Sequence, residues 1–102
     1  MKLIETLSEK ISEEICDAKS YAELAIENRE AYPDLAETLY ELSVDELGHM
    51  SKLHTAAVGI IEKYREEKGE PPAAMLAVYE YLHKKQIEKA AEAKAMQEMF
   101  KG

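Results

Sequence analysis

The stretch Asp45-Glu46-Leu47-Gly48-His49 interrupts an apolar helical pattern, and it indicates how the chain folds. Around it, side chains recur at alternating steps of three and four residues, the spacing of one helix face. Glu46 and His49 occupy neighbouring positions on that face, and residues three apart on a helix project from the same side. They can hold one metal ion if a second helix brings another carboxylate to the same depth. The predicted face reads Leu35, Leu39, Leu42, Glu46, His49, Leu53, Ala56 or Ala57, Ile60 and Tyr64.

A preceding helix, predicted over about residues 2–31, supplies such a carboxylate. Glu14 falls on its apolar face, whereas the neighbouring Glu13 points elsewhere. Burying an unpaired carboxylate is costly, so Glu14 is expected at the rim of an interface, protonated, or bound to a cation. The predicted face reads Ile4, Leu7, Ile11, Glu14, Ala18, Tyr21, Ala25 and Asn28, flanked by Ile15, Ala22 and Ile26.

Two breaks divide the chain into three helices. Pro33 disfavours a helical conformation at Tyr32 and suits the first turn of a new helix, predicted over about residues 34–68. A connection this short makes the first two helices antiparallel neighbours. The stretch Lys68-Gly69-Glu70-Pro71-Pro72 marks the second break, and a third helix is predicted over about residues 73–100. The sequence therefore predicts one all-α domain over residues 1–102, a helical hairpin with a third helix packed across it or against another subunit.

Composition narrows the classes of function. The net charge of -8 argues against nucleic-acid binding, which needs a basic surface. No apolar run approaches the roughly 20 residues that span a membrane, and the N-terminus lacks a signal-peptide pattern, so we expect a soluble cytoplasmic protein. The single cysteine, Cys16, forms no internal disulfide and supplies no paired thiolates for a zinc site. A chain of 102 residues often completes its core by oligomerising.

The spacing of the polar residues resembles that of the ferritin-like superfamily, specifically its rubrerythrin and encapsulated-ferritin branches. Glu14 with Tyr21 seven residues later, and Glu46-Leu47-Gly48-His49 on the next helix, carry this resemblance over about residues 10–57. It implies a ferritin-like antiparallel hairpin and a di-iron carboxylate site with Glu14, Glu46 and His49 as metal ligands. It also implies that Tyr21 hydrogen-bonds a ligand carboxylate and orients it.

The chain holds half of the ligand set that this resemblance implies. Two copies would supply four carboxylates and two imidazoles, so we expect a four-helix bundle completed by dimerisation, in a homodimer at minimum or a higher ring. Such a site would oxidise iron(II) to iron(III). No Cys-x-x-Cys pair is present for a rubredoxin-type module, so ferroxidase activity is favoured over peroxide reduction unless a separate protein donates electrons.

Several alternatives remain open at this point. The polar residues can instead set the register of a helical oligomerisation module without metal, and manganese or another divalent metal can replace iron. Glu80 and His83 form a second Glu-x-x-His beside Lys84 and Lys85, without an apparent complementary buried glutamate. If Glu80 and His83 have a function, we expect them to bind a cation at the surface or at an accessory site. His54 lies off the predicted face and is expected to be partly exposed.

Overall fold

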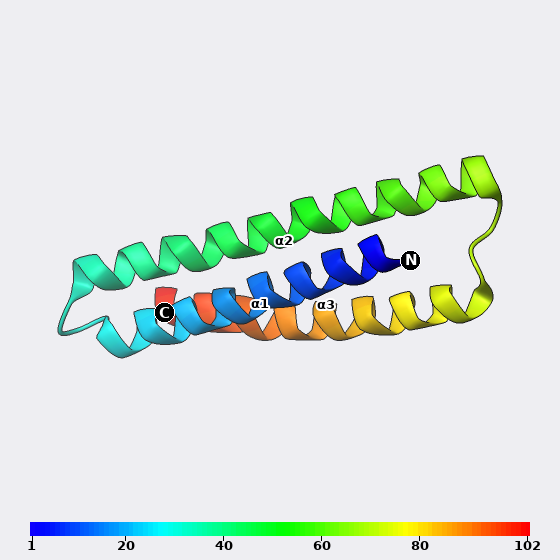
Figure 1. Ribbon diagram of the computed structural model, residues 1–102. Coiled ribbons are helices and arrows are strands. Elements are labelled where there is room, and N and C mark those ends of the chain that lie inside the picture. Colours follow the sequence, from blue (N-terminus) through cyan, green and yellow to red (C-terminus); the bar gives the residue numbers. More distant parts are fainter.

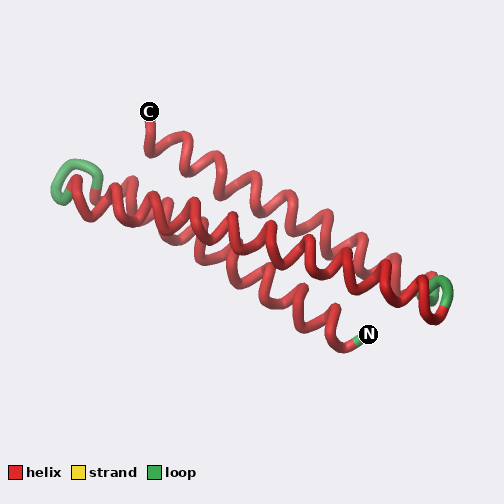
Figure 2. Tube along the Cα trace, turned by 90° about the horizontal axis from the view of Figure 1, so that it is seen from above, coloured by secondary structure: helices red, strands yellow, loops and turns green.

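The computed structural model describes residues 1–102 and consists of three α-helices without strands (Figure 1). They are α1 (Lys2–Asn28), α2 (Pro33–Lys68) and α3 (Ala73–Lys101). The three run side by side along a rod of 56 × 18 × 18 Å, with the connecting loops at opposite ends (Figure 2). The predicted all-α class is confirmed. None of the helices combines the length and apolar character needed to cross a lipid bilayer.

Three of the six helix ends lie where they were predicted, and the other three differ by one to three residues. Helix α1 ends at Asn28 rather than at residue 31, because the chain reverses before Pro33 and Tyr32 adopts a non-helical conformation (φ -138°, ψ 70°). The Tyr32 N–H donates to the Asn28 carbonyl at 2.9 Å and closes this turn. Helix α2 begins at Pro33, and α3 extends to Lys101. Gly69 ends α2 with φ 84°, in the left-handed region that favours glycine.

Helix α1 is the central element of the rod. It packs along α2 and also against α3, whereas α2 and α3 contact each other much less. The main core cluster joins all three helices through Ile11, Ile15, Ala18, Leu47, Ala90 and Ala93. Only 17 of 102 residues are buried, so one chain alone has a small core.

Buried polar side chains connect the three helices at defined positions. Ser43 on α2 donates its hydroxyl to the Ala18 carbonyl of α1 at 2.6 Å, and Gln97 on α3 donates to the Ser43 hydroxyl at 2.8 Å. Nearer the other end, the Gln86 amide donates to the Ser8 carbonyl at 3.0 Å. Such bonds satisfy buried polar groups and set how α3 is rotated against the hairpin.

The predicted inner face of α2 was wrong by about one residue in rotation at Leu35 and Leu42, whereas Ala57 is buried as predicted. Leu35 and Leu42 were predicted to be buried, but they are 48% and 37% exposed. Ala36, Ser43 and Leu47 are buried in their place. The small Ala36 and Ser43 side chains face the inside of the rod, and Ser43 takes part in the polar network just described. Leu42 lies one helix turn before Glu46, and Leu35 lies two turns further toward the start of α2.

Candidate metal centre

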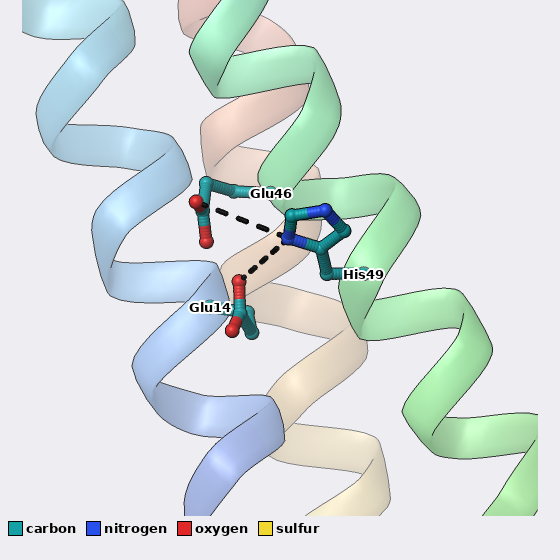
Figure 3. Close-up of side chains that lie close together, drawn as sticks. All are labelled: Glu14, Glu46 and His49. Carbon is teal, nitrogen blue, oxygen red and sulfur yellow. Dashed lines mark hydrogen bonds and ion pairs between the residues drawn. The ribbon is translucent and has the colours of Figure 1, made fainter.

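Three side chains with metal-binding atoms meet on one face of the hairpin (Figure 3). Glu14 projects from α1, and Glu46 and His49 project from successive turns of α2. The His49 Nδ1 atom lies 3.3 Å from Glu14 Oε2 and 3.9 Å from Glu46 Oε1. One donor atom from each of the three lies within 4.8 Å of the others. The structure thus brings together the three predicted ligands.

This group lies on the side of the hairpin that α3 does not cover (Figure 3). On α1, Ser8 and Ser12 face α3, because the Gln86 amide donates to the Ser8 carbonyl at 3.0 Å and to the Ser12 hydroxyl at 3.2 Å. Glu14 follows Ser12 by two residues, which puts them on nearly opposite sides of a helix with 3.6 residues per turn. The candidate site therefore opens outward from the single chain.

Exposure differs among the three side chains. The Glu46 and Glu14 side chains are 18% and 26% exposed, whereas the His49 side chain is 54% exposed. The carboxylates thus form the inner part of the site and the imidazole its outer edge. A ligand from outside the chain can approach next to His49 without moving the core.

The titration of Glu46 is strongly perturbed by its neighbours. The hydrogen-bonded contact with Glu14, together with burial and repulsion from the Glu14 charge, raises the pKa of Glu46 to about 7 from 4.5. The nearby His49 opposes this rise only in part. At neutral pH the pair is therefore held partly neutral by a proton. A cation placed between the two carboxylates would relieve the same repulsion.

The donor set fits iron(II) or a similar divalent ion. Carboxylate oxygens and an imidazole nitrogen suit iron, manganese and zinc, and ligand bonds of about 2 Å place donor atoms roughly 3–4 Å apart around one ion. The separations of 3.3 and 3.9 Å from His49 to the two carboxylates lie in that range. Three donors leave coordination positions free for a second chain, water or an oxidant.

Tyr21 lies on α1 two turns beyond Glu14 and is half-buried. No hydrogen bond joins its hydroxyl to Glu14, Glu46 or His49 within one chain. Its role in orienting a carboxylate therefore stays a prediction. The sequence interpretation overlooked Asp17, one turn after Glu14, whose charge also raises the pKa of Glu46. Asp17 follows Glu14 by three residues, and this spacing could have placed it on the same side of α1.

The second Glu-x-x-His is arranged differently. Glu80 is exposed, whereas His83 faces α2 and stacks on His54, with ring centroids 4.2 Å apart. The His54 and His83 side chains lie on the α3 side of the rod and are separate from the group of Glu14, Glu46 and His49. His54 is half-buried, in keeping with the prediction of partial exposure.

Comparison of the chain with models of known protein families, with curated proteins and with solved structures finds no match.

Proposed function

We propose that this protein is a ferritin-like di-iron carboxylate protein that binds iron at a site shared by two subunits and oxidises iron(II) to iron(III). The observation that carries the proposal is the convergence of Glu14, Glu46 and His49 on the uncovered face of the hairpin. The family assignment itself rests on the resemblance of these residues and Tyr21 to the ferritin-like pattern.

Exposed apolar side chains along α1 and α2, on both sides of the site in sequence, support a partner at this face. Leu35, Leu42 and His49 follow one another at seven-residue steps and share one side of α2. On α1, Leu3 precedes Glu14 by three turns, and Leu24 follows Tyr21 by one turn. Large apolar residues gathered around a polar group are typical of an interface. The exposed fractions of Leu3, Leu24, Leu35 and Leu42 are 51%, 40%, 48% and 37%.

A second copy is the partner that balances the charge of the site. One chain offers two carboxylates and one imidazole. Two chains related by a twofold axis would offer four carboxylates, whose negative charges equal the positive charges of two iron(II) ions. The same symmetry pairs equivalent leucines across the axis, since a twofold interface uses one patch on both subunits. We therefore propose a homodimer as the smallest active unit, and a larger ring is compatible with it.

The side chains have separate tasks in this proposal. Glu46 would give up its proton when a metal ion binds, and the charges of Glu46 and Glu14 would together offset the positive charge of the ion. His49 donates the Nδ1 lone pair from the outer edge, where water and an oxidant have access. Iron(II) held by these residues would be oxidised to iron(III) by dioxygen, with two ions supplying two electrons. Manganese is an alternative occupant because the donor set also suits it.

Anaerobic titration with iron(II), followed by exposure to air, tests this function. We expect the wild-type protein to bind one iron per chain and to oxidise it faster than buffer does. Glu14→Gln, Glu46→Gln and His49→Ala should each abolish both properties. Glu13→Gln is the matched control, because the Glu13 side chain is 63% exposed and pairs only with Lys10. A wild-type protein that binds no iron, or a Glu46→Gln variant that oxidises it normally, would contradict the proposal.

A further inference from the structure

A cavity of about 310 Å³ lies between α2 and α3, on the side of the rod away from Glu14 and Glu46. It arises because α2 and α3 both pack against α1 but contact each other little. Ile11 of α1 and Ala90 of α3 contribute apolar lining. The side chains of Met50, His54 and His83 also line the cavity, and none of them has a task in the iron site.

Two imidazoles face each other in this cavity although they come from different helices. The rings of His54 on α2 and His83 on α3 are parallel within 5°, and their centroids are 4.2 Å apart. Because the nitrogen lone pairs lie in the ring planes, the two stacked rings must turn before they can share one ion. Rotation of each ring about its Cβ–Cγ bond would turn one nitrogen of each toward a common point. Tyr79 also stacks with His83, at a centroid distance of 6.2 Å.

A third donor lies on the same face of α2. Met50 precedes His54 by four residues, so its thioether and the His54 imidazole project from the same side of the helix. Met50 is half-buried and lines the cavity together with both histidines. Burial and the neighbouring His54 lower the pKa of His83, which favours the neutral ring with one nitrogen lone pair free.

We propose that Met50, His54 and His83 form a binding site for one copper(I) ion. The thioether of Met50 is a soft donor that favours copper(I), and imidazole also binds copper. No carboxylate lines the cavity, and Lys94 is its one permanently charged lining side chain. A hard divalent cation would therefore find no negative side chain to balance its two charges. A soft monovalent ion carries one charge and needs less compensation. The donor set distinguishes this site from the carboxylate-rich group of Glu14, Glu46 and His49 on the opposite face.

Competition with the chromogenic copper(I) chelator bicinchoninate, under anaerobic conditions with ascorbate, tests the site. All variants carry Cys16→Ser, because Cys16 is a free exposed thiol that can itself bind copper(I). We expect the Cys16→Ser protein to withdraw one copper(I) per chain from the chelator. His54→Asn, His83→Asn and Met50→Leu should each weaken binding at least about tenfold, a usual scale for a disturbed metal site. Met96→Leu is the matched control, because Met96 does not line the cavity.

The iron site serves as an independent reference. Glu46→Gln should leave copper(I) binding unchanged, and His83→Asn should leave iron(II) binding unchanged, so failure of one proposal is separable from failure of the other. Circular dichroism of each variant checks that the helices persist. Three results would overturn the copper proposal: no copper(I) withdrawn by the Cys16→Ser protein, wild-type affinity in the His54→Asn/His83→Asn double variant, or equal effects of Met50→Leu and Met96→Leu.

Discussion

The Glu14 carboxylate lies 3.3 Å from the His49 imidazole although 35 residues separate them in the chain. The antiparallel hairpin creates this proximity, since the turn before Pro33 returns α2 along α1. Glu46 joins the pair from the preceding turn of α2 and is itself held against Glu14. The fold thus holds Glu14, Glu46 and His49 close together. Their closeness affects stability and metal binding in ways that can be measured.

Stability of the metal-free protein should depend on the charge of Glu46. Its pKa of about 7 in the folded chain exceeds the ordinary 4.5, so between these values the folded state binds a proton that the unfolded state has lost. Stability from this group is therefore fully present below about pH 4.5 and is lost as the pH rises to about 7. Glu46→Gln should remove this loss and raise the unfolding free energy at pH 8 by about 1 kcal/mol, a small figure because solvent screens the site.

Chemical denaturation in the presence of a chelator, at pH 5 and pH 8, measures this difference. Glu13→Gln provides the control, and its exposed position should leave stability within about 0.5 kcal/mol of wild type. A Glu46→Gln protein less stable than wild type at pH 8 would show that the ionised carboxylate is stabilised by a partner other than a metal.

Iron binding should release a proton near neutral pH. The ion must displace the proton that Glu46 retains in the metal-free protein, so affinity should fall about tenfold per unit as the pH drops below about 7. Isothermal titration in two buffers with different ionisation enthalpies gives the number of protons released. Equal affinity at pH 6 and pH 7.5, with no proton released, would show that Glu46 is not a ligand.

Leu42→Glu should break the dimer. Leu42 is 37% exposed and lies one helix turn before Glu46 on the face proposed to pair with a second copy. In a twofold interface the new carboxylate would meet both its own copy and the acidic site, and like charges in contact oppose association. Sedimentation velocity should then show a monomer that binds iron weakly.

Val78→Glu is the control for that change. Val78 is 59% exposed on α3, away from the proposed interface, so its replacement should leave the dimer intact. If Leu42→Glu sediments like wild type, the leucine-rich face of α1 and α2 is not the interface.

Gly48→Ala should stabilise the protein. Gly48 lies within α2, where glycine is about 1 kcal/mol less favourable than alanine, and an added Cβ would meet no atom within 4 Å. No contact within the chain therefore requires a glycine at this position. Thermal unfolding should show a higher midpoint for Gly48→Ala. A lower midpoint, or a smaller assembly, would reveal that a neighbouring subunit approaches the α2 backbone at Gly48.

Much of the hairpin was predictable from the sequence because its signals are local. Pro33 and Gly69 act on their own neighbours, and they marked the ends of α2 to within one residue. The three-residue step from Glu46 to His49 is a property of any helix. Glu14 was identified because a carboxylate is costly to bury on an apolar helix face unless it is paired. The structure places Glu14 beside Glu46 and His49.

The remaining features depend on how the helices are rotated against one another. Ser43 and Gln97 are buried and form part of the inner face. A prediction from hydropathy puts polar residues of this kind on the solvent-exposed surface. This network accompanies the displacement of Leu42 from the predicted core of α2. The stacking of His54 on His83 depends on the rotation of α3, whose apolar pattern is irregular and defines no single face.

A crystal structure of the protein loaded anaerobically with iron(II), with anomalous scattering recorded at the iron edge, tests the shared site most directly. We expect two iron peaks on opposite sides of a twofold axis, about 4 Å apart or less, as in two-metal centres. Glu14, Glu46 and His49 of both copies should surround them. A single iron bound within one chain, or two irons in separate sites with no ligand from the second copy, would contradict a centre shared between subunits.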